Sequence, residues 1–391
     1  RRISTTCSCA PCDQNVSSTE NLACLPSSND LQKSIPVNID DYKALKKLKP
    51  FQPQNPHLLK VSILGEPNAG KSTLTNSLVK WKVCAVSSKV HTTRKKAAAV
   101  LVEENKQIVF LDTPGFVTPE QIKKHSLESS FVMDPRLSVR DANIIAVVVD
   151  IANKYTNNRI NENILELLQD FKEKQTILIL NKIDAMKSKT RLLSFTKTLT
   201  CGCIGGVPTS EFEKTSEEKG TAIDDVPSDV GKKSVETDFN NNQNSFISQK
   251  RQKDGWPHFS RVFMVSSLKN DGIEDLRNYL FSQAIPHDWM YPDSLVTDQH
   301  PHDIALMIVR EKLLEYLPQE IPYQVQMTIS KWELLPSGCP KIDIKIHCTT
   351  PRHKRFIIGP NGKHIAACAD KSRKAMREAF RKDVVLHLGV K

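Results

Sequence analysis

The sequence predicts an α/β domain, with a mostly parallel sheet and helices on both of its faces, followed by a smaller α+β domain. Two observations support this fold class. From about residue 58, short apolar runs alternate with helix-like stretches, which is typical of parallel strands joined by crossover helices. From about residue 302 the pattern restarts as a helix, two alternating strands, a basic helix and a last strand. We therefore expect two folded domains joined by a linker.

Composition narrows the class of protein. Of the 391 residues, 39% are apolar, and no apolar run approaches the roughly 20 residues of a membrane span. We therefore expect no transmembrane segment, and any membrane contact would be peripheral. The chain has ten cysteines, too few for a disulfide scaffold at this length, and a reducing compartment is the simpler inference.

The first part of the chain, residues 1–55, is predicted to be a disordered segment that carries one short amphipathic helix, Ile39–Leu48. Up to about residue 37 it is rich in Ser, Asn and Pro and has no periodicity. The chain starts with Arg1 and Arg2 and has no acid before Asp13, which fits the remainder of an organellar transit peptide and equally a disordered end. The helix packs on the protein or lies on a membrane surface, and packing is favoured.

A phosphate-binding loop is predicted between an apolar run, Leu58–Leu64, and a helix. The stretch has the pattern G-x-x-x-x-G-K-S-T, and the strand–loop–helix context gives that pattern its meaning. The alternative is a glycine turn that happens to precede Lys-Ser. In a phosphate loop, Lys71 places its charge between the β- and γ-phosphates and the Ser72 hydroxyl holds Mg²⁺. The residues of this phosphate loop are Gly65, Glu66, Pro67, Asn68, Ala69, Gly70, Lys71, Ser72 and Thr73.

Two further segments are expected to contact the γ-phosphate and Mg²⁺. Thr93 lies in the polar stretch Val90–Lys96 and can reach both groups, releasing them after hydrolysis. The apolar run Ile108–Leu111 predicts a buried strand, so Asp112 at its carboxyl end would bind Mg²⁺ through water and the Gly115 N–H would meet the γ-phosphate. The predicted contacts in this motif are Asp112, Thr113, Pro114 and Gly115. The predicted catalytic residues are Lys71, Thr93 and Gly115, and the predicted Mg²⁺ ligands are Ser72, Thr93 and Asp112.

A guanine-binding motif follows the next strand pair. The run Thr176–Leu180 ends in Asn181-Lys182-Ile183-Asp184, and a carboxylate at Asp184 can accept from both N1–H and the N2 amino group of guanine. Asn181 would tie the base to the loops, while the Lys182 stem would cover the ring face. After the strand Val262–Val265, backbone N–H groups would meet the guanine O6. These last predicted contacts are Ser266, Ser267 and Leu268.

Domain limits follow from the same pattern. The first domain is expected to span residues 56–285, with a disordered insertion at about 198–258 that has almost no apolar periodicity. Residues 286–301 form a linker, and residues 302–391 form the second domain.

The second domain has the element order of a type II KH module, whose glycine loop clamps a nucleic-acid backbone. Its G-x-x-G turn, Gly359 to Gly362, lies between apolar flanks and beside basic residues. The net charge of +11 is concentrated here, since Arg352–Lys391 holds eleven Lys and Arg against three acids. A solvated basic helix face is the alternative. The predicted RNA-binding residues are Lys354, Arg355, Ile358, Gly359, Pro360, Asn361, Gly362, Lys363, Lys371, Arg373 and Lys374.

Taken together, the two domains resemble the Era family of small-ribosomal-subunit assembly GTPases. The resemblance covers about Leu58–Thr198 and His258–Lys391. Besides the order of the motifs, it depends on the phosphate loop as a whole, Gly-x-Pro-Asn-x-Gly-Lys-Ser-Thr, on Tyr291-Pro292 and Thr297-Asp298 in the linker, and on Ile308–Leu314.

The resemblance implies a P-loop GTPase that uses GTP and Mg²⁺, with a K⁺ ion held by Asn68 as in some related GTPases. It also implies binding of small-subunit ribosomal RNA near its 3′ end and assistance in assembling that subunit. GTP binding would reposition the KH domain. The expected location is the mitochondrial matrix, with any membrane contact peripheral to the inner membrane, and the expected state is a monomer.

The chain differs from Ras-like proteins at Phe116, where relatives also use a hydrophobic residue, and it differs from relatives at two positions. Phe116 stands where Ras-like proteins carry the glutamine that orients the attacking water, so intrinsic turnover is expected to be slow. Pro360 stands where relatives usually carry Lys, so one phosphate contact is weaker or is made by Lys363. Ser267 replaces a frequent Ala, which leaves the backbone contact intact.

Two other functions stay open at this point. Phe116 also fits an RNA chaperone or RNA-binding module in which the nucleotide is mainly structural. The third function is that of a GTPase that acts on tRNA or at membranes.

Overall fold

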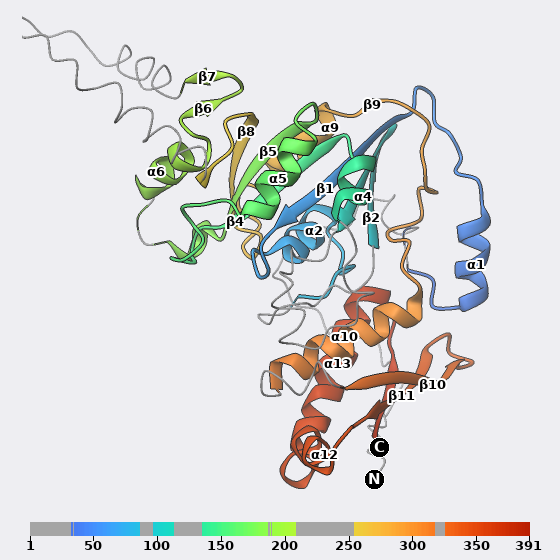
Figure 1. Ribbon diagram of the computed structural model, residues 1–391. Helices are drawn as coiled ribbons and strands as arrows, with labels where there is room; N and C mark the ends of the chain where they lie inside the picture. Colours follow the sequence, from blue (N-terminus) through green and yellow to red (C-terminus); the bar gives the residue numbers. More distant parts are fainter. Residues whose placement is uncertain are drawn as a thin grey trace, which may run out of the picture.

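The computed structural model describes residues 33, 35–86, 97–112, 135–186, 188, 190–208, 254–316 and 325–391 (Figure 1). Five residues singled out from the sequence lie outside the described residues: Thr93, Thr113, Pro114, Gly115 and Phe116. Within the described ranges, no helix is both long enough and apolar enough to cross a membrane.

The first domain is built on one sheet with the strand order β2-β3-β1-β4-β5-β8, and short β9 adds to β1. Strand β1 pairs in parallel with β3 and β4, β4 with β5 and β5 with β8, whereas β2 is antiparallel to β3 and β9 to β1. The predicted mostly parallel sheet is therefore confirmed. The strands are β1 (His57–Gly65), β2 (Ala97–Glu103), β3 (Lys106–Asp112), β4 (Ile144–Asp150), β5 (Gln175–Asn181), β8 (Phe259–Val265) and β9 (Ile285–Pro286).

Helices cover both faces of this sheet, as predicted. Successive residues of β4 alternate between two apolar clusters, since Ala146 packs in one cluster and Ile145 and Val147 pack in the other. Helices α2 and α9 belong to the first cluster, and α4, α5 and α6 to the second. The helices are α2 (Lys71–Val79), α4 (Pro135–Asp141), α5 (Glu162–Asp170), the 3₁₀ turn η2 (Ile183–Ala185), α6 (Thr190–Leu199) and α9 (Ile273–Ser282).

The N-terminal helix α1 (Ile39–Lys47) packs on the protein, which was the favoured alternative. Its first turn is capped by the Asn38 side chain, and the hydroxyl of buried Tyr42 donates to the Asp298 carbonyl at 2.7 Å. Ile35 and Val37 are also buried. The disorder predicted for residues 1–55 therefore does not extend to this segment. Its few apolar side chains pack against the linker and the second domain.

Both ends of the predicted insertion, residues 198–208 and 254–258, form part of the folded domain. A hairpin of β6 (Cys203–Ile204) and β7 (Val207–Pro208) follows α6, and the Gly205 N–H donates to the Phe259 carbonyl at 2.8 Å. On the other side, Trp256 is buried and its backbone N–H donates to the Leu199 carbonyl. Strands of two residues are too short to show a period in the sequence.

The second domain is a three-stranded sheet, order β10-β11-β12, covered by helices. Strand β11 is antiparallel to β10 and parallel to β12, and it buries every second residue: Ile342, Ile344 and Ile346. The elements are α10 (Pro301–Tyr316), β10 (Gln326–Leu334), β11 (Pro340–His347), α12 (Pro351–Ile358), η3 (Pro360–Gly362), α13 (Lys363–Phe380) and β12 (Val385–Val390). The predicted order is confirmed, with α12 as an additional helix before the glycine turn.

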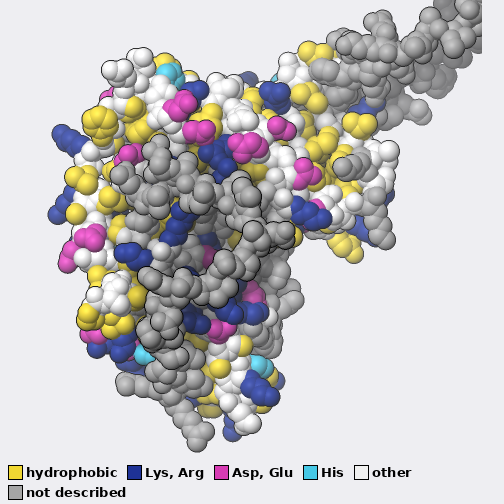
Figure 2. Space-filling model, turned by 180° about the vertical axis from the view of Figure 1, so that it is seen from behind, with side chains coloured by type: hydrophobic (Ala, Val, Ile, Leu, Met, Phe, Trp, Pro, Cys, Tyr) yellow, Lys and Arg dark blue, Asp and Glu magenta, His cyan; other side chains and the backbone are white. Residues whose placement is uncertain are grey.

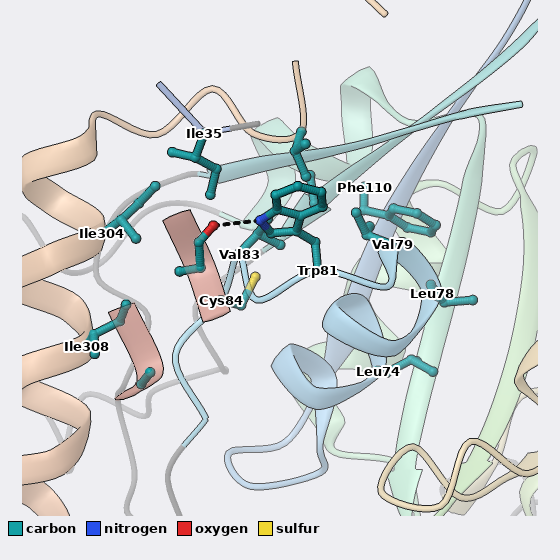
Figure 3. Close-up of a cluster of buried hydrophobic side chains, with 14 of the residues drawn as sticks. Ile35, Leu74, Leu78, Val79, Trp81, Val83, Cys84, Phe110, Ile304 and Ile308 are labelled. Atoms are coloured by element: carbon teal, nitrogen blue, oxygen red, sulfur yellow. Dashed lines mark hydrogen bonds between the residues drawn. The ribbon is translucent and has the colours of Figure 1, made fainter. Parts of the chain in front are cut away.

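The two domains share one apolar cluster (Figure 3). Trp81, Val83 and Cys84, directly after α2, are buried between α2 and α10. The Trp81 Nε1–H donates to the Ala379 carbonyl of α13 at 2.7 Å. The second domain is therefore packed firmly against the helix that follows the phosphate loop.

Candidate nucleotide and nucleic-acid sites

The phosphate loop joins the end of β1 to the start of α2 and requires glycine at two positions. A Cβ on Gly65 would lie 2.5 Å from the Val148 carbonyl oxygen, and one on Gly70 would lie 2.3 Å from Asn181 Nδ2. Gly70 also has φ 89°, in the left-handed region. No side chain caps α2, so the N–H groups of its first turn face the loop, where a phosphate would accept them.

Lys71 is held inside this loop. Its side chain is buried, and Nζ donates to the carbonyls of Gly65 at 2.9 Å and Glu66 at 2.8 Å. A buried ammonium group needs such hydrogen-bond partners. Held in this way, the Lys71 ammonium is a fixed positive charge that an anion in the loop can contact. Ser72, one residue further along α2, is partly exposed at the same end of the helix.

The backbone of Asp112 lies at the carboxyl end of β3, opposite Ile63 of β1. This register places it beside the last residues before the phosphate loop. Ser72 and Asp112 thus start from neighbouring elements, and both carry oxygen donors of the kind that Mg²⁺ prefers.

Asn181 connects the end of β5 to the phosphate loop and to the loop after β8. It is almost fully buried at the end of β5, and its Nδ2 donates to the Ala69 carbonyl at 2.9 Å. Its Oδ1 accepts from the Ser267 N–H at 3.2 Å and from the Ser267 hydroxyl at 2.9 Å. The hydroxyl contact was not anticipated, because only the backbone of Ser267 was assigned a role.

Asp184 is oriented by a neighbour on β8's exit loop. The Ser266 hydroxyl donates to Asp184 Oδ1 and accepts from the Lys269 N–H. Ser266 is fully buried and pairs through its backbone with Asp271, so this hydroxyl has a fixed position. Leu268, the next predicted contact, is 79% exposed at the tip of the same loop. Because one of its oxygens is fixed in this way, the carboxylate has a defined orientation in which it can accept hydrogen bonds from a base.

The second candidate site is the glycine turn between α12 and α13. Gly359 has φ 70° and its Cβ position lies 2.4 Å from the His364 ring, while Gly362 has φ 80°. Asn361 also adopts a left-handed conformation, φ 51°. The turn therefore brings backbone to the surface with Pro360 and Asn361 exposed, which suits contact with a phosphate backbone.

A cavity of about 720 Å³ lies beside this turn. The Phe356 ring is 39% exposed there, and the Arg352 guanidinium lies 5.7 Å from its centroid. An exposed aromatic ring next to a guanidinium is a surface on which an unstacked base can stack. The lining residues are Pro351, Arg352, Arg355, Phe356, Gly359, Pro360 and His364.

The predicted basic residues fall into two groups. Lys354, Arg355 and Lys363 are exposed around the turn, and Ile358 is partly buried beside it. Further along α13 the cations are ion-paired: Lys371 with Glu315 at 3.4 Å, Arg373 with Asp370 at 3.3 Å and Lys374 with Asp370 at 3.0 Å. On the face in Figure 2, Lys and Arg side chains are spread over the molecule and several lie at the lower end, where Figure 1 places α12.

A parallel sheet with a phosphate loop after its first strand, and an Asn-Lys-x-Asp motif held against that loop, defines a P-loop GTPase with a type II KH domain behind it. A family model described as 50S ribosome-binding GTPase matches residues 60–182. The chain is 38% identical to the mitochondrial GTPase Era of Salmo salar over 88% of this chain and 78% of that one. The chain belongs to the Era family of GTPases, and it hydrolyses GTP.

Other relatives agree with this assignment. The mitochondrial GTPase Era of Danio rerio is 38% identical over 88% of this chain and 77% of its own, and the GTPase Era of Mesorhizobium japonicum is 32% identical over 85% and 87%. A solved structure of Era in complex with MgGDPNP and nucleotides 1506–1542 of 16S ribosomal RNA covers 86% of this chain and 93% of its own, with a TM-score of 0.62 and 23% identity. This last likeness concerns the fold.

Proposed function

We propose that this chain is a mitochondrial switch that binds small-subunit ribosomal RNA near its 3′ end and assists assembly of the small ribosomal subunit. The observation that carries the proposal is the packing of a guanine-nucleotide site and a G-x-x-G module on one apolar cluster. The mitochondrial names of relatives from three animals support the compartment, and the Era complex with 16S ribosomal RNA supports the kind of ligand. The matrix, with peripheral contact to the inner membrane, is part of the proposal.

In this mechanism the nucleotide is bound through both ends. Lys71 and the N–H groups of α2 neutralise the phosphates, while Asp184 and Asn181 hold the guanine. Mg²⁺, when bound, would neutralise charge on the phosphates, and we assign Ser72 and Asp112 to hold it, since both residue types carry oxygen donors that suit this ion. We assign Thr93 and Gly115 to the γ-phosphate and Asn68 to a K⁺ ion on the resemblance alone. Slow turnover follows from Phe116, which cannot orient water.

The KH domain supplies the output. The glycine turn holds the RNA backbone, and Phe356 with Arg352 receives a base in the neighbouring cavity. Since Trp81 directly follows α2 and contacts α13, a change in the nucleotide domain has a direct route to the position of the KH domain.

Crosslinking the protein to RNA in cells and sequencing the attached fragments tests target and compartment together. We expect fragments from the 3′ end of mitochondrial small-subunit RNA. An Asn361→Asp variant adds one negative charge to the turn without a change of shape, and we expect it to reduce the yield at least about tenfold. The matched control is Asn55→Asp, which is also exposed and left-handed, φ 52°, but lies before β1. Fragments from tRNA, or an equal yield from both variants, would refute the proposal.

A further inference from the structure

We infer that Asp150 is a positioning residue for guanine nucleotides: it holds the Lys182 side chain in place over the base and ties it to the phosphate loop. The inference depends on guanine-nucleotide binding by this family and adds a residue that lies outside the sequence motifs. It does not depend on which RNA the KH domain binds.

Asp150 lies at the same end of the sheet as the Asn-Lys-x-Asp motif, as this role requires. It is the last residue of β4 and pairs in register with Asn181, so its side chain starts beside the Asn-Lys-x-Asp motif. The carboxylate is 14% exposed, and both of its oxygens have partners. Oδ1 accepts from the Ala152 N–H at 3.0 Å, and Oδ2 accepts from Lys182 Nζ at 2.6 Å. The backbone contact orients the carboxylate, and the oriented carboxylate then holds the ammonium.

Lys182 makes the second half of the connection. Its Nζ also donates to the Asn68 carbonyl in the phosphate loop at 2.7 Å, so one ammonium joins the end of β4 to that loop. Its backbone, with φ 67°, is fixed by an N–H donated to Asn181 Oδ1. A lysine stem has four rotatable carbons, and anchoring both of its ends leaves the stem in one place.

The consequence concerns binding rather than chemistry. A stem that is already ordered loses little freedom when a guanine ring slides beneath it, whereas a free lysine would have to be ordered on binding. Asp150 is therefore expected to increase the affinity of the protein for GDP and for GTP equally. It has no part in choosing guanine over xanthine, because that choice belongs to Asp184.

The simpler alternative is that Asp150 only caps the turn after β4 through Ala152. An Asp150→Asn variant separates the two roles, because the amide oxygen still accepts from the Ala152 N–H while Lys182 loses the negative charge that it pairs with. The decisive comparison is a double-mutant cycle with Lys182→Met. Asp170→Asn is the control, since Asp170 at the end of α5 pairs with Arg136 of α4 and is remote from Asp150.

The experiment measures GDP and GTP affinity by calorimetry, together with kcat and KM. We expect Asp150→Asn to weaken the binding of both nucleotides about tenfold and to raise KM for GTP. The value of kcat and the preference for GDP over XDP should be preserved. In the Lys182→Met background the same substitution should change affinity less than about twofold. Equal losses in the two backgrounds, or no loss in the wild-type background, would overturn the inference. Failure of the wild-type protein to bind GDP would instead refute the guanine site itself.

Discussion

At the scale of single residues, the side chains of the candidate guanine site are held by hydrogen bonds to neighbouring residues. Asn181 is fixed by the Ala69 carbonyl and Ser267, and Asp184 by the Ser266 hydroxyl. Each of these groups would otherwise have to be desolvated and oriented when the nucleotide binds. The site is therefore preorganised, and changes of single atoms in it should have large effects.

Replacing the carboxylate of Asp184 by an amide should reverse the base preference. An Asp184→Asn variant offers an N–H donor where guanine also has donors, whereas xanthine has an acceptor at that position. We expect GDP affinity to fall by at least about a hundredfold and XDP affinity to rise, because a buried polar group without a partner is costly. Competition of GDP and XDP for a fluorescent nucleotide measures both. Retained GDP selectivity would mean that another group recognises the base.

Gly70 should not tolerate even a methyl group. In Gly70→Ala the new Cβ would meet Asn181 Nδ2 at 2.3 Å, which breaks the contact between Asn181 and the phosphate loop. Gly206→Ala is the matched control: its φ of 82° is close to the 89° of Gly70, yet nothing lies within 4 Å of its Cβ position. We expect about 1–2 kcal/mol of strain at either site and loss of GDP binding only at Gly70. Urea unfolding and calorimetry separate the two effects, and equal GDP affinities would contradict this account.

The residues of the candidate nucleotide site could be proposed from the sequence at this scale, because a motif records the residues that touch a ligand. Residues that support those contacts could not. Asp150 and the Ser266 hydroxyl act through Lys182 and Asp184, and their proximity depends on strand register and on the path of a loop. The signal for Asp150 was present all the same: like Asp112, it ends a buried apolar run.

At the scale of elements, helix α12 shows what the pattern alone missed. Its eight residues bury Ile357 on one face, but the neighbouring glycine turn drew attention to the loop. The start signal was clear, with Thr350 as the N-cap, accepting from the His353 N–H, and Pro351 in the first turn. The long strands β4 and β5 were predicted from continuous apolar runs, whereas β6, β7 and β9, at two residues each, carry no period.

Helix α13 contains an acid that weakens its own basic surface. Hydrogen bonds from Lys374 and Arg373 lower the pKa of Asp370 below its ordinary value. The ion pairs are therefore present at neutral pH, persist as the pH falls through the ordinary range for Asp, and are lost only below the lowered pKa. Asp370 thus neutralises part of the charge offered to RNA at any physiological pH.

Removing that acid should tighten RNA binding. Asp370→Asn raises the net charge of the surface by one and releases both cations, so we expect affinity to rise a few-fold and the salt dependence to become steeper by about one unit of slope. Asp383→Asn is the control, because Asp383 pairs with Arg377 in the last turn of α13, farther from the glycine turn. Filter binding from 50 to 300 mM salt measures both variants. Unchanged binding by Asp370→Asn would place the RNA away from this part of the helix.

At the scale of the whole molecule, the interface between the domains is built as a core. Trp81 is buried, donates to Ala379 and has the Arg381 guanidinium 3.5 Å from its ring centroid. Glu311 of α10 is 2% exposed and accepts from Lys82 at 3.1 Å and from the Val86 N–H at 3.0 Å. The sequence pattern gave no sign of this interface, since Trp81 and Val83 resemble ordinary core residues of the first domain.

A continuous core predicts that the two domains unfold together. We expect a single thermal transition for the wild-type protein, and GDP should raise it as a whole because ligand binding stabilises everything coupled to the site. Trp81→Ala removes the indole from the interface and should cost about 3–5 kcal/mol. Because the lost contacts join the two domains, the thermal transition should split in two. Only the transition of the first domain should then still be raised by GDP.

Trp256→Ala distinguishes loss of coupling from loss of stability. Trp256 is equally buried, but its indole packs within the first domain and donates to the Thr176 hydroxyl at 3.3 Å. Its removal should therefore lower the transition temperature by a similar amount and leave one transition that GDP still raises. Differential scanning calorimetry with and without GDP makes the comparison. If Trp81→Ala also unfolds in one step, the nucleotide domain and the KH domain are coupled through contacts other than this cluster.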